Sequence, residues 1–170
     1  MDIKSIIRDI PDFPKPGIIF KDITPLLKHP QAFRETVELL AKSVKGLGVT
    51  DVVGIEARGF IFGSALALRL GVGFVPIRKP RKLPYQTISE CYSLEYGTDS
   101  IEMHCDALAR GDRVVLVDDL LATGGTMRAA AQLVERTGAE VKRILFVVEL
   151  EFLKGREKLA GYDVHSLILF

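Results

Sequence analysis

Short apolar runs alternate with segments of helical periodicity along most of the chain. The apolar runs are rich in Val, Ile and Leu, and they cover residues 52–55, 74–77, 113–117, 141–148 and 164–169. Runs of this kind are typical of strands that are buried on both faces of a parallel sheet. The segments with apolar residues at helical spacing are 30–44, 59–70, 125–137 and 154–159. This alternation predicts an α/β fold with an open, mostly parallel sheet that is flanked by helices.

The N-terminal segment departs from this alternation. Apolar residues at helical spacing predict a short helix that Asp2 caps. These residues are Ile3, Ile6, Ile7 and Ile10. Prolines and a glycine within 11–17 predict an irregular segment, and Thr24 followed by Pro25 predicts the N-cap and first turn of a second short helix.

A second departure covers residues 79–105, where no helix alternates with the strands. Residues 88–96 and 100–104 predict two strands that are joined at 97–99 as a β-hairpin. We therefore expect an appended, flexible hairpin loop. It could cover a site at the carboxyl ends of the strands, where open α/β sheets bind ligands.

Composition and charge narrow the classes of protein. With 170 residues, of which 48% are hydrophobic, the chain is expected to form a single domain with a substantial core. A formal net charge of +1 argues against a nucleic-acid binder. The chain has no apolar run of about 18 residues and no pattern of a secretory signal, so we expect neither a membrane span nor export.

The two cysteines, Cys91 and Cys105, do not form a C-x-x-C motif. We expect both to be free thiols in a reducing compartment, which predicts a cytoplasmic protein. His104 lies beside Cys105, but the further ligands that a tetrahedral zinc site needs are missing at suitable spacing.

The segment 114–126 carries the clearest chemical pattern. A predicted buried strand leads into Asp118 and Asp119, a turn rich in Gly and Thr follows, and a helix then begins. Backbone amides of such a turn and the helix dipole attract a phosphate, while the carboxylates can meet sugar hydroxyls or a metal bound to them. We expect a site for a ribose that carries a 5′-phosphate; a solvated strand end is the alternative for an isolated acidic pair. The residues expected to hold the phosphate are Ala122, Thr123, Gly124, Gly125 and Thr126.

Two common phosphate motifs do not fit this turn. A P-loop has a Lys after its second glycine, and no Lys follows Gly125. The G-x-G sequence at 71–73 lies after a predicted helix and before a strand, whereas a dinucleotide-binding fingerprint lies between a strand and a helix. The turn therefore belongs to neither class.

The segment 114–126 resembles the signature of the type I phosphoribosyltransferases, which bind 5-phosphoribosyl 1-pyrophosphate. Four further blocks resemble the members of this family that use adenine, and the five blocks follow the family's order over nearly the whole chain. These further blocks are residues 13–23, 56–60, 78–84 and 92–97. Between Lys82 and Tyr92 the chain departs from the family's pattern.

The resemblance implies a single domain, residues 1–170, with two specialised parts. Residues 1–30 would form an N-terminal hood that recognises the base, and residues 79–105 would form the flexible loop and hairpin. The resemblance also implies a homodimer and Mg²⁺ as a cofactor. The metal would be held mainly through the substrate, with Asp118 and Asp119 as candidate protein ligands.

The cations expected at the pyrophosphate lie in two blocks. A guanidinium at Arg58, just past a predicted strand end, suits a pyrophosphate through paired hydrogen bonds, although a surface ion pair with Glu56 is the alternative. The compact basic loop at 78–82 suits the same anion, although a solvated loop or a nucleic-acid patch are alternatives. The resemblance assigns this role to Arg58, Arg78, Lys79 and Lys82.

The resemblance also implies residues that act on the base and on the sugar. Glu95 would exchange a proton with the purine, and Phe20 would stack on it. The alternatives are that Glu95 is an ordinary exposed residue of a strand and that Phe20 is an ordinary core residue. The backbone of Ile19 and Lys21 would read the edge of adenine. The resemblance makes Glu95, Asp118 and Asp119 the catalytic residues.

Together these residues predict an enzyme of purine salvage. It would transfer the phosphoribosyl group reversibly from 5-phosphoribosyl 1-pyrophosphate to adenine and give AMP and pyrophosphate. Two alternatives stay open. One is a phosphoribosyltransferase for a 6-oxopurine, and the other is a regulator that binds 5-phosphoribosyl 1-pyrophosphate without turning it over.

Overall fold

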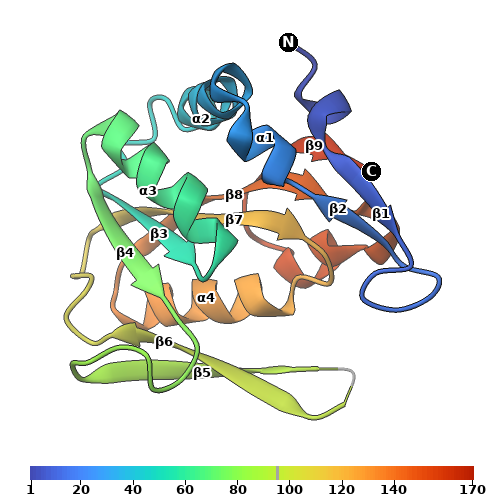
Figure 1. Cartoon of the computed structure of the whole chain (residues 1–170). Helices are drawn as coiled ribbons and strands as arrows, with labels where there is room; N and C mark the ends of the chain where they lie inside the picture. The colour runs from blue at the N-terminus through green and yellow to red at the C-terminus, as the bar shows by residue number, and fades with distance from the viewer. Residues whose placement is uncertain (95) are drawn as a thin grey trace.

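The computed structural model of the chain describes residues 1–94 and 96–170. Five parallel strands form its central sheet: β3 (Asp51–Ile55), β4 (Gly73–Ile77), β7 (Arg113–Leu121), β8 (Glu140–Glu149) and β9 (Val164–Leu169). Their order across the sheet is β4-β3-β7-β8-β9 (Figure 1). This confirms the predicted open, parallel α/β sheet. Because the strands are parallel, their carboxyl ends all meet at one edge.

Helices cover both faces of this sheet. α2 (Pro30–Ser43) and α3 (Arg58–Leu70) lie on one face, and α4 (Gly125–Arg136) lies on the other (Figure 1). Successive side chains of a strand point to opposite faces. In β7, Leu116 therefore packs on the α4 side and Val115 packs on the side of α2 and α3. Burial on both faces explains why the strands read as unbroken apolar runs.

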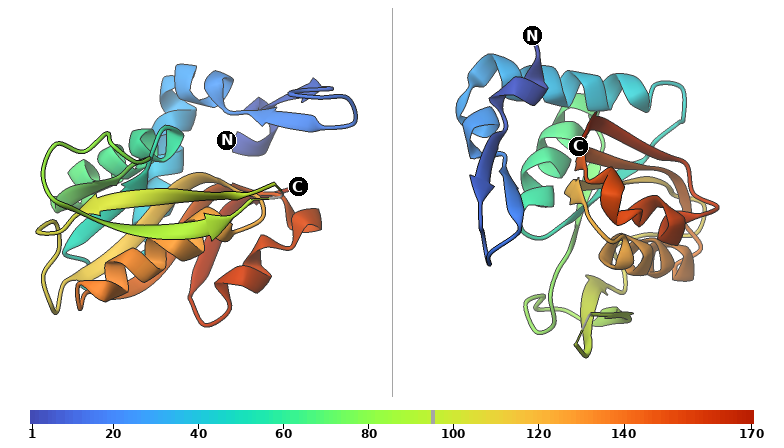
Figure 2. Two further views of the ribbon diagram at one scale, coloured as in Figure 1. Left: turned by 90° about the horizontal axis from the view of Figure 1, so that it is seen from below. Right: turned by 90° about the vertical axis from the view of Figure 1, so that its right-hand side faces the viewer.

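A separate antiparallel hairpin packs against α4 (Figure 2). Its strands are β5 (Thr87–Ser93) and β6 (Thr98–His104). Ile101 and Met103 of β6 are buried and join the core on this side of the sheet. The hairpin confirms the prediction, but its first strand ends at Ser93 and not at residue 96. The turn closes earlier because Leu94 N–H donates to the carbonyl of Gly97 at 2.9 Å.

The N-terminal segment forms a small hood near the carboxyl ends of the sheet strands (Figure 1). It contains η1 (Ile3–Ile6), β1 (Arg8–Pro11), β2 (Ile19–Asp22) and α1 (Thr24–Lys28). β1 and β2 pair as an antiparallel hairpin. The sequence analysis did not predict this hairpin, because prolines and charged residues interrupt the alternation that marks a strand.

The predicted N-terminal helix is only partly correct. Asp2 caps it as expected, since its Oδ1 accepts a hydrogen bond from Lys4 N–H at 3.0 Å. The helix is of the 3-10 type and ends at Ile6. Ile10 instead pairs with Phe20 in the hood hairpin. A residue that precedes proline, as Ile10 does, disfavours the helical conformation.

The predicted N-cap of α1 is wrong by one position. Thr24 is already helical, and the N-cap is Ile23. Asp22 satisfies the helix start instead, because its Oδ1 accepts Thr24 N–H at 2.9 Å and its Oδ2 accepts the Thr24 hydroxyl at 2.9 Å. These hydrogen bonds lower the pKa of Asp22, and the one from the backbone of Thr24 contributes most.

Two other elements differ from their predicted bounds. β7 continues to Leu121, so the acidic pair lies within the strand and Asp118 is in register with Phe146 of β8. The short helix predicted at 154–159 is the 3-10 helix η3 (Gly155–Leu159), and a further 3-10 helix that was not predicted, η2 (Glu151–Leu153), precedes it. Within the described residues, every helix is too short or too polar to traverse a lipid bilayer.

An ion pair between a buried carboxylate and a half-exposed guanidinium joins β8 to η3 and can be tested. Glu149 is 4% exposed, and its two carboxylate oxygens accept hydrogen bonds from Arg156 Nε at 2.8 and 3.0 Å. Burial opposes ionisation of Glu149, but the contact with Arg156 outweighs it and lowers the pKa. We expect Arg156→Met to lower the free energy of unfolding by about 1–2 kcal/mol at about pH 7, because it leaves the buried carboxylate unpaired while solvent already screens the half-exposed guanidinium.

The sign of the pH dependence follows from the lowered pKa of Glu149. The stabilisation is complete above the ordinary carboxyl pKa of 4.5 and is lost as the pH falls through the lower folded value. Urea unfolding at about pH 7 and about pH 3 should therefore give a large difference between the two proteins only at the higher pH. Arg34→Met, on the exposed face of α2, is the control and should change stability by less than about 0.5 kcal/mol.

Candidate active site

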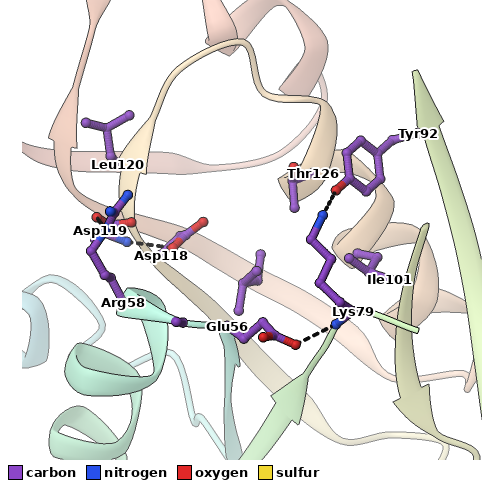
Figure 3. A pocket seen from close by; sticks show the side chains of 11 residues that line it. Glu56, Arg58, Lys79, Tyr92, Ile101, Asp118, Asp119, Leu120 and Thr126 are labelled. Carbon is purple, nitrogen blue, oxygen red and sulfur yellow. Dashed lines mark hydrogen bonds and ion pairs between the residues drawn. The ribbon is translucent and has the colours of Figure 1, made fainter. Parts of the chain in front are cut away.

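A cavity of about 330 Å³ opens where the carboxyl ends of β3 and β7 face the hairpin (Figure 3). Its charged and hydroxyl-bearing walls come from separate parts of the chain. These residues include Glu56, Arg58, Lys79, Tyr92, Asp118 and Asp119. The sheet and the hairpin thus bring together four of the sequence blocks that were linked only by resemblance, which are 56–60, 78–84, 92–97 and 114–126.

Arg58, the first residue of α3, contacts the acidic pair of β7. Its Nε donates to Asp119 Oδ2 at 2.5 Å, and Asp119 N–H donates to Asp118 Oδ1 at 2.8 Å. The helix can approach this closely because Gly59 has no side chain, and a Cβ there would lie 2.9 Å from Asp118 Oδ1. Arg58 therefore pairs with Asp119 and not with Glu56, the alternative partner considered from the sequence.

The two acidic residues have different electrostatic environments. Burial raises the pKa of Asp118 well above its usual value, and the negative charge of the adjacent Asp119 raises it further. Arg58 acts in the opposite direction without offsetting these effects. Asp119, only 6% exposed, has the guanidinium of Arg58 as its direct partner. A cation or hydroxyl donor that reached Asp118 would relieve the cost of its charge, as expected at a binding site.

Glu56, at the end of β3, gathers the basic loop that follows β4. Its Oε1 accepts Lys79 N–H at 2.6 Å, and its Oε2 accepts Lys82 Nζ at 2.8 Å. Arg78 Nε lies 3.3 Å from Oε1. Burial opposes ionisation of Glu56, but these contacts outweigh it and lower its pKa. The sequence analysis considered Glu56 only as a partner for Arg58. The sequence did hold a signal for this contact, because Glu56 is an acidic residue at a strand end and the chain has one compact cluster of cations at 78–82.

Lys79 extends from the same basic loop into the cavity (Figure 3). Its Nζ donates to Tyr92 OH of β5 at 2.5 Å and pairs with Asp99 of β6. Neither Tyr92 nor Asp99 was among the predicted site residues, although Tyr92 begins the block 92–97. Arg78 and Lys82 lie beside Glu56, outside the cavity lining.

The turn between β7 and α4 surrounds an adjoining cavity of about 90 Å³. Its lining includes Asp118 and the predicted phosphate residues Ala122, Thr123, Gly124, Gly125 and Thr126. Gly124 is the N-cap of α4 and has φ of +87°, a conformation that favours glycine. It has no side chain with which to satisfy the first N–H groups of α4. These groups are therefore available to an anion at the positive end of the helix dipole.

The three residues expected at the base are divided between two places. Phe20 lies beside the cavity, with Arg58 Cζ 5.6 Å from the centroid of its ring. Ile19 and Lys21 line a different cavity of about 480 Å³, together with Phe170. Lys21 Nζ also pairs with Asp9 at 2.6 Å. Glu95 lies outside the residues that the structure describes, so its role stays a prediction.

The oxygen donors at the end of β7 fit a Mg²⁺ ion held mainly by its ligand. Mg²⁺ prefers oxygen atoms, and proteins often provide only one or two carboxylates while substrate phosphates and waters complete the shell. Asp118 and Asp119 are two such carboxylates in the lining of the larger cavity, and Asp118 also lines the adjoining one. In the described part of the chain, no group of three or more potential ligands could hold a metal by itself.

The raised pKa of Asp118 leads to a test of stability. We expect Asp118→Asn to raise the free energy of unfolding of the protein without substrate by about 1 kcal/mol at about pH 7, because the variant removes the cost of a charge that is partly withdrawn from solvent and lies beside Asp119. The cost first appears as the pH rises above the usual value of 3.8 and is complete above the raised folded value. The gain should therefore disappear in urea unfolding at about pH 3.

Asp106→Asn, which changes an exposed carboxylate in the turn after β6, is the matched control. It should leave stability nearly unchanged at both pH values. A gain for Asp118→Asn that stays the same at low pH would contradict the assigned electrostatic cause.

Comparison with known proteins agrees with this geometry. A model of the phosphoribosyl transferase domain matches residues 22–167. The adenine phosphoribosyltransferase of Carboxydothermus hydrogenoformans is 61% identical over 170 residues, which cover 100% of both chains. The crystal structure of the adenine phosphoribosyltransferase from Thermoanaerobacter pseudethanolicus is 60% identical. It has a TM-score of 0.97 and covers 99% of this chain and 98% of that chain.

A more distant solved structure is that of the Trypanosoma brucei adenine phosphoribosyl transferase in complex with AMP, pyrophosphate and ribose-5-phosphate. It is 27% identical, has a TM-score of 0.89, and covers 98% of this chain and 78% of that chain. A family model matches most of the chain, and a relative is 61% identical over its full length. The chain therefore belongs to the adenine phosphoribosyltransferases, within the phosphoribosyltransferase family.

Proposed function

We propose that the protein catalyses the reversible transfer of the phosphoribosyl group from 5-phosphoribosyl 1-pyrophosphate to adenine, which gives AMP and pyrophosphate in purine salvage. One observation carries this proposal. An acidic pair, a guanidinium and an open helix N-terminus lie around two adjoining cavities that share Asp118. They suit the ribose hydroxyls, the pyrophosphate and the 5′-phosphate of one substrate. Membership among the adenine phosphoribosyltransferases supports adenine as the base.

The sugar is the part of the substrate that acquires charge. When the bond from C1′ to pyrophosphate breaks, positive charge develops on the ribose ring. Asp118 and Asp119 accept hydrogen bonds from the ribose hydroxyls, and their negative charge stabilises that cation. The turn at 122–126 holds the 5′-phosphate through its amides and so fixes the ring for attack by the base.

The leaving pyrophosphate needs positive charge that is already in position. Arg58, Arg78, Lys79 and Lys82 supply it, and Glu56 keeps the basic loop next to β3 through its contacts with Lys79 N–H and Lys82 Nζ. Bound Mg²⁺, held mainly through the substrate and next to Asp118 and Asp119, would neutralise further charge on this group.

The base is held on the hood side of the site. Phe20 stacks on the purine, and its position beside Arg58 supports this role. The backbone of Ile19 and Lys21 reads the edge of adenine. Glu95 exchanges a proton with the base as its ring nitrogen becomes the nucleophile.

We further propose one catalytic domain, residues 1–170, with a base-recognising hood at 1–30 and a flexible hairpin loop at 79–105. Two copies would form a homodimer. Cys91 and Cys105 are free and exposed, which supports a reducing, cytoplasmic compartment.

A base screen tests the proposed reaction. The purified protein is incubated with Mg²⁺, 5-phosphoribosyl 1-pyrophosphate and one of adenine, hypoxanthine, guanine or xanthine, and nucleotide formation is followed. We expect AMP from adenine and little product from the other bases. Turnover of a 6-oxopurine would overturn the choice of base. Tight binding of the sugar donor without turnover of any base would overturn the proposed reaction.

Two substitutions test the proposed catalytic residues. Asp119→Asn removes charge next to the developing cation, and Glu95→Leu removes the group that exchanges a proton with the base. We expect each variant to lose about 10²–10³-fold in kcat. Steady-state kinetics of AMP formation measures this loss, and Asp106→Asn is the control. Near wild-type rates in both variants would contradict the assigned roles.

A pair of glycine substitutions tests the phosphate turn. At Gly124, φ is positive and a Cβ would lie 2.5 Å from the carbonyl oxygen of Gly155, so alanine must distort the turn. At Gly125, the nearest atom to an added Cβ is 3.9 Å away, so alanine fits and keeps its N–H. We expect Gly124→Ala to raise the KM for the sugar donor by about tenfold or more, and Gly125→Ala to change it by less than about threefold. Similar KM values for the two variants would contradict this explanation.

A further inference from the structure

The hairpin engages the ammonium group of Lys79. Its Nζ pairs with Asp99 Oδ2 and donates to Tyr92 OH at 2.5 Å. Tyr92 OH also donates to Asp99 Oδ2 at 3.2 Å. Tyr92 and Asp99 are directly opposite each other on β5 and β6. The two strands therefore present one cluster of oxygen atoms to a lysine that comes from the loop after β4.

Contacts other than those with Tyr92 and Asp99 hold the main chain next to this lysine, to Glu56 on one side and to Glu102 of β6 on the other. Lys79 N–H donates to Glu56 Oε1 at 2.6 Å. The N–H and carbonyl of Arg78 pair with the backbone of Glu102 at 2.9 and 2.7 Å. The flexible side chain of Lys79 can thus change partners while its backbone stays in place. It already lines the cavity that contains Arg58, so it can exchange partners without leaving the site.

The groups around Lys79 favour a change of its ion-pair partner over the loss of its proton. Burial disfavours the charged form of Lys79, but Asp99 and Tyr92 outweigh it and raise the pKa of the ammonium. Lys79 therefore remains a cation. The pair is also partly exposed, since 40% of the Lys79 side chain and 34% of the Asp99 side chain are accessible. Ion pairs of this exposure are weak, and an anion with more charge than a carboxylate can replace one partner.

We propose that Asp99 is a positioning residue for Lys79. The carboxylate of Asp99 competes with pyrophosphate for the ammonium group of Lys79. Without pyrophosphate, Asp99 holds Lys79 on the hairpin. When pyrophosphate binds, it replaces the Asp99 carboxylate as the partner of Lys79. This inference rests on the proposed contact of Lys79 with pyrophosphate. Asp99 thereby weakens pyrophosphate binding, and binding of pyrophosphate frees the Tyr92–Asp99 pair from the loop after β4.

Asp99→Asn tests the proposal, because asparagine keeps the size of the side chain and an acceptor oxygen but removes the charge. We expect the KM for pyrophosphate in the conversion of AMP to adenine to fall about 2- to 5-fold, with kcat and the KM for AMP changed by less than about 2-fold. Titration calorimetry with magnesium pyrophosphate should show the same direction. Asp99→Glu keeps the charge and should have a KM near that of the parent protein.

A double-mutant cycle shows whether Asp99 acts through Lys79. Lys79→Met should raise the KM for pyrophosphate, and adding Asp99→Asn to it should cause no further change. Asp106→Asn should leave the KM unchanged. A higher KM in Asp99→Asn, or an equal fall in the Lys79→Met background, would overturn the role of Asp99. If Lys79→Met leaves the KM for pyrophosphate unchanged, the proposed contact of Lys79 itself is overturned, and the role of Asp99 with it.

Discussion

The close approach of α3 to the end of β7 is the constraint on which the site depends. A Cβ at Gly59 would collide with Asp118, and a Cβ at Gly63 would lie 2.8 Å from the ring of Phe74. Glycine at both positions lets the helix lie directly on the sheet. Only at this distance can Arg58, at the start of the helix, reach Asp119. After burial, the charge of Asp119 is the main influence on the pKa of Asp118, which borders both cavities.

Several cations around the site pair with carboxylates of the protein. Arg58 pairs with Asp119, Lys82 with Glu56, and Lys79 with Asp99. An anionic substrate must therefore exchange partners with protein carboxylates. The cations that the proposed function assigns to pyrophosphate are thus balanced locally by carboxylates, in keeping with a net charge of +1 for the whole chain.

The two antiparallel hairpins are additions to a sheet that is complete without them. The hood hairpin places Phe20 beside Arg58, and the β5–β6 hairpin places Tyr92 and Asp99 beside Lys79. The sheet and α4 hold the residues that the proposed function assigns to the sugar and its phosphate. The added hairpins hold residues that it assigns to the base and to pyrophosphate, the two groups that exchange places on the ribose.

The sequence by itself determined the order of the sheet strands and of the helices that flank the sheet, the parallel sheet, the β5–β6 hairpin, and the turn at 122–126. These features follow from apolar periodicity and turn residues, which are local properties. The hood hairpin escaped prediction because its prolines hide the strand pattern, and Ile10 fitted a helical spacing by coincidence. Only the tertiary structure decided the partners of the charged residues. Glu56 was adjacent enough in sequence to pair with Arg58, yet it holds Lys79 and Lys82, while Arg58 meets a carboxylate 61 positions away. Such contacts depend on strand order and register, which are properties of the assembled sheet and not of any single segment.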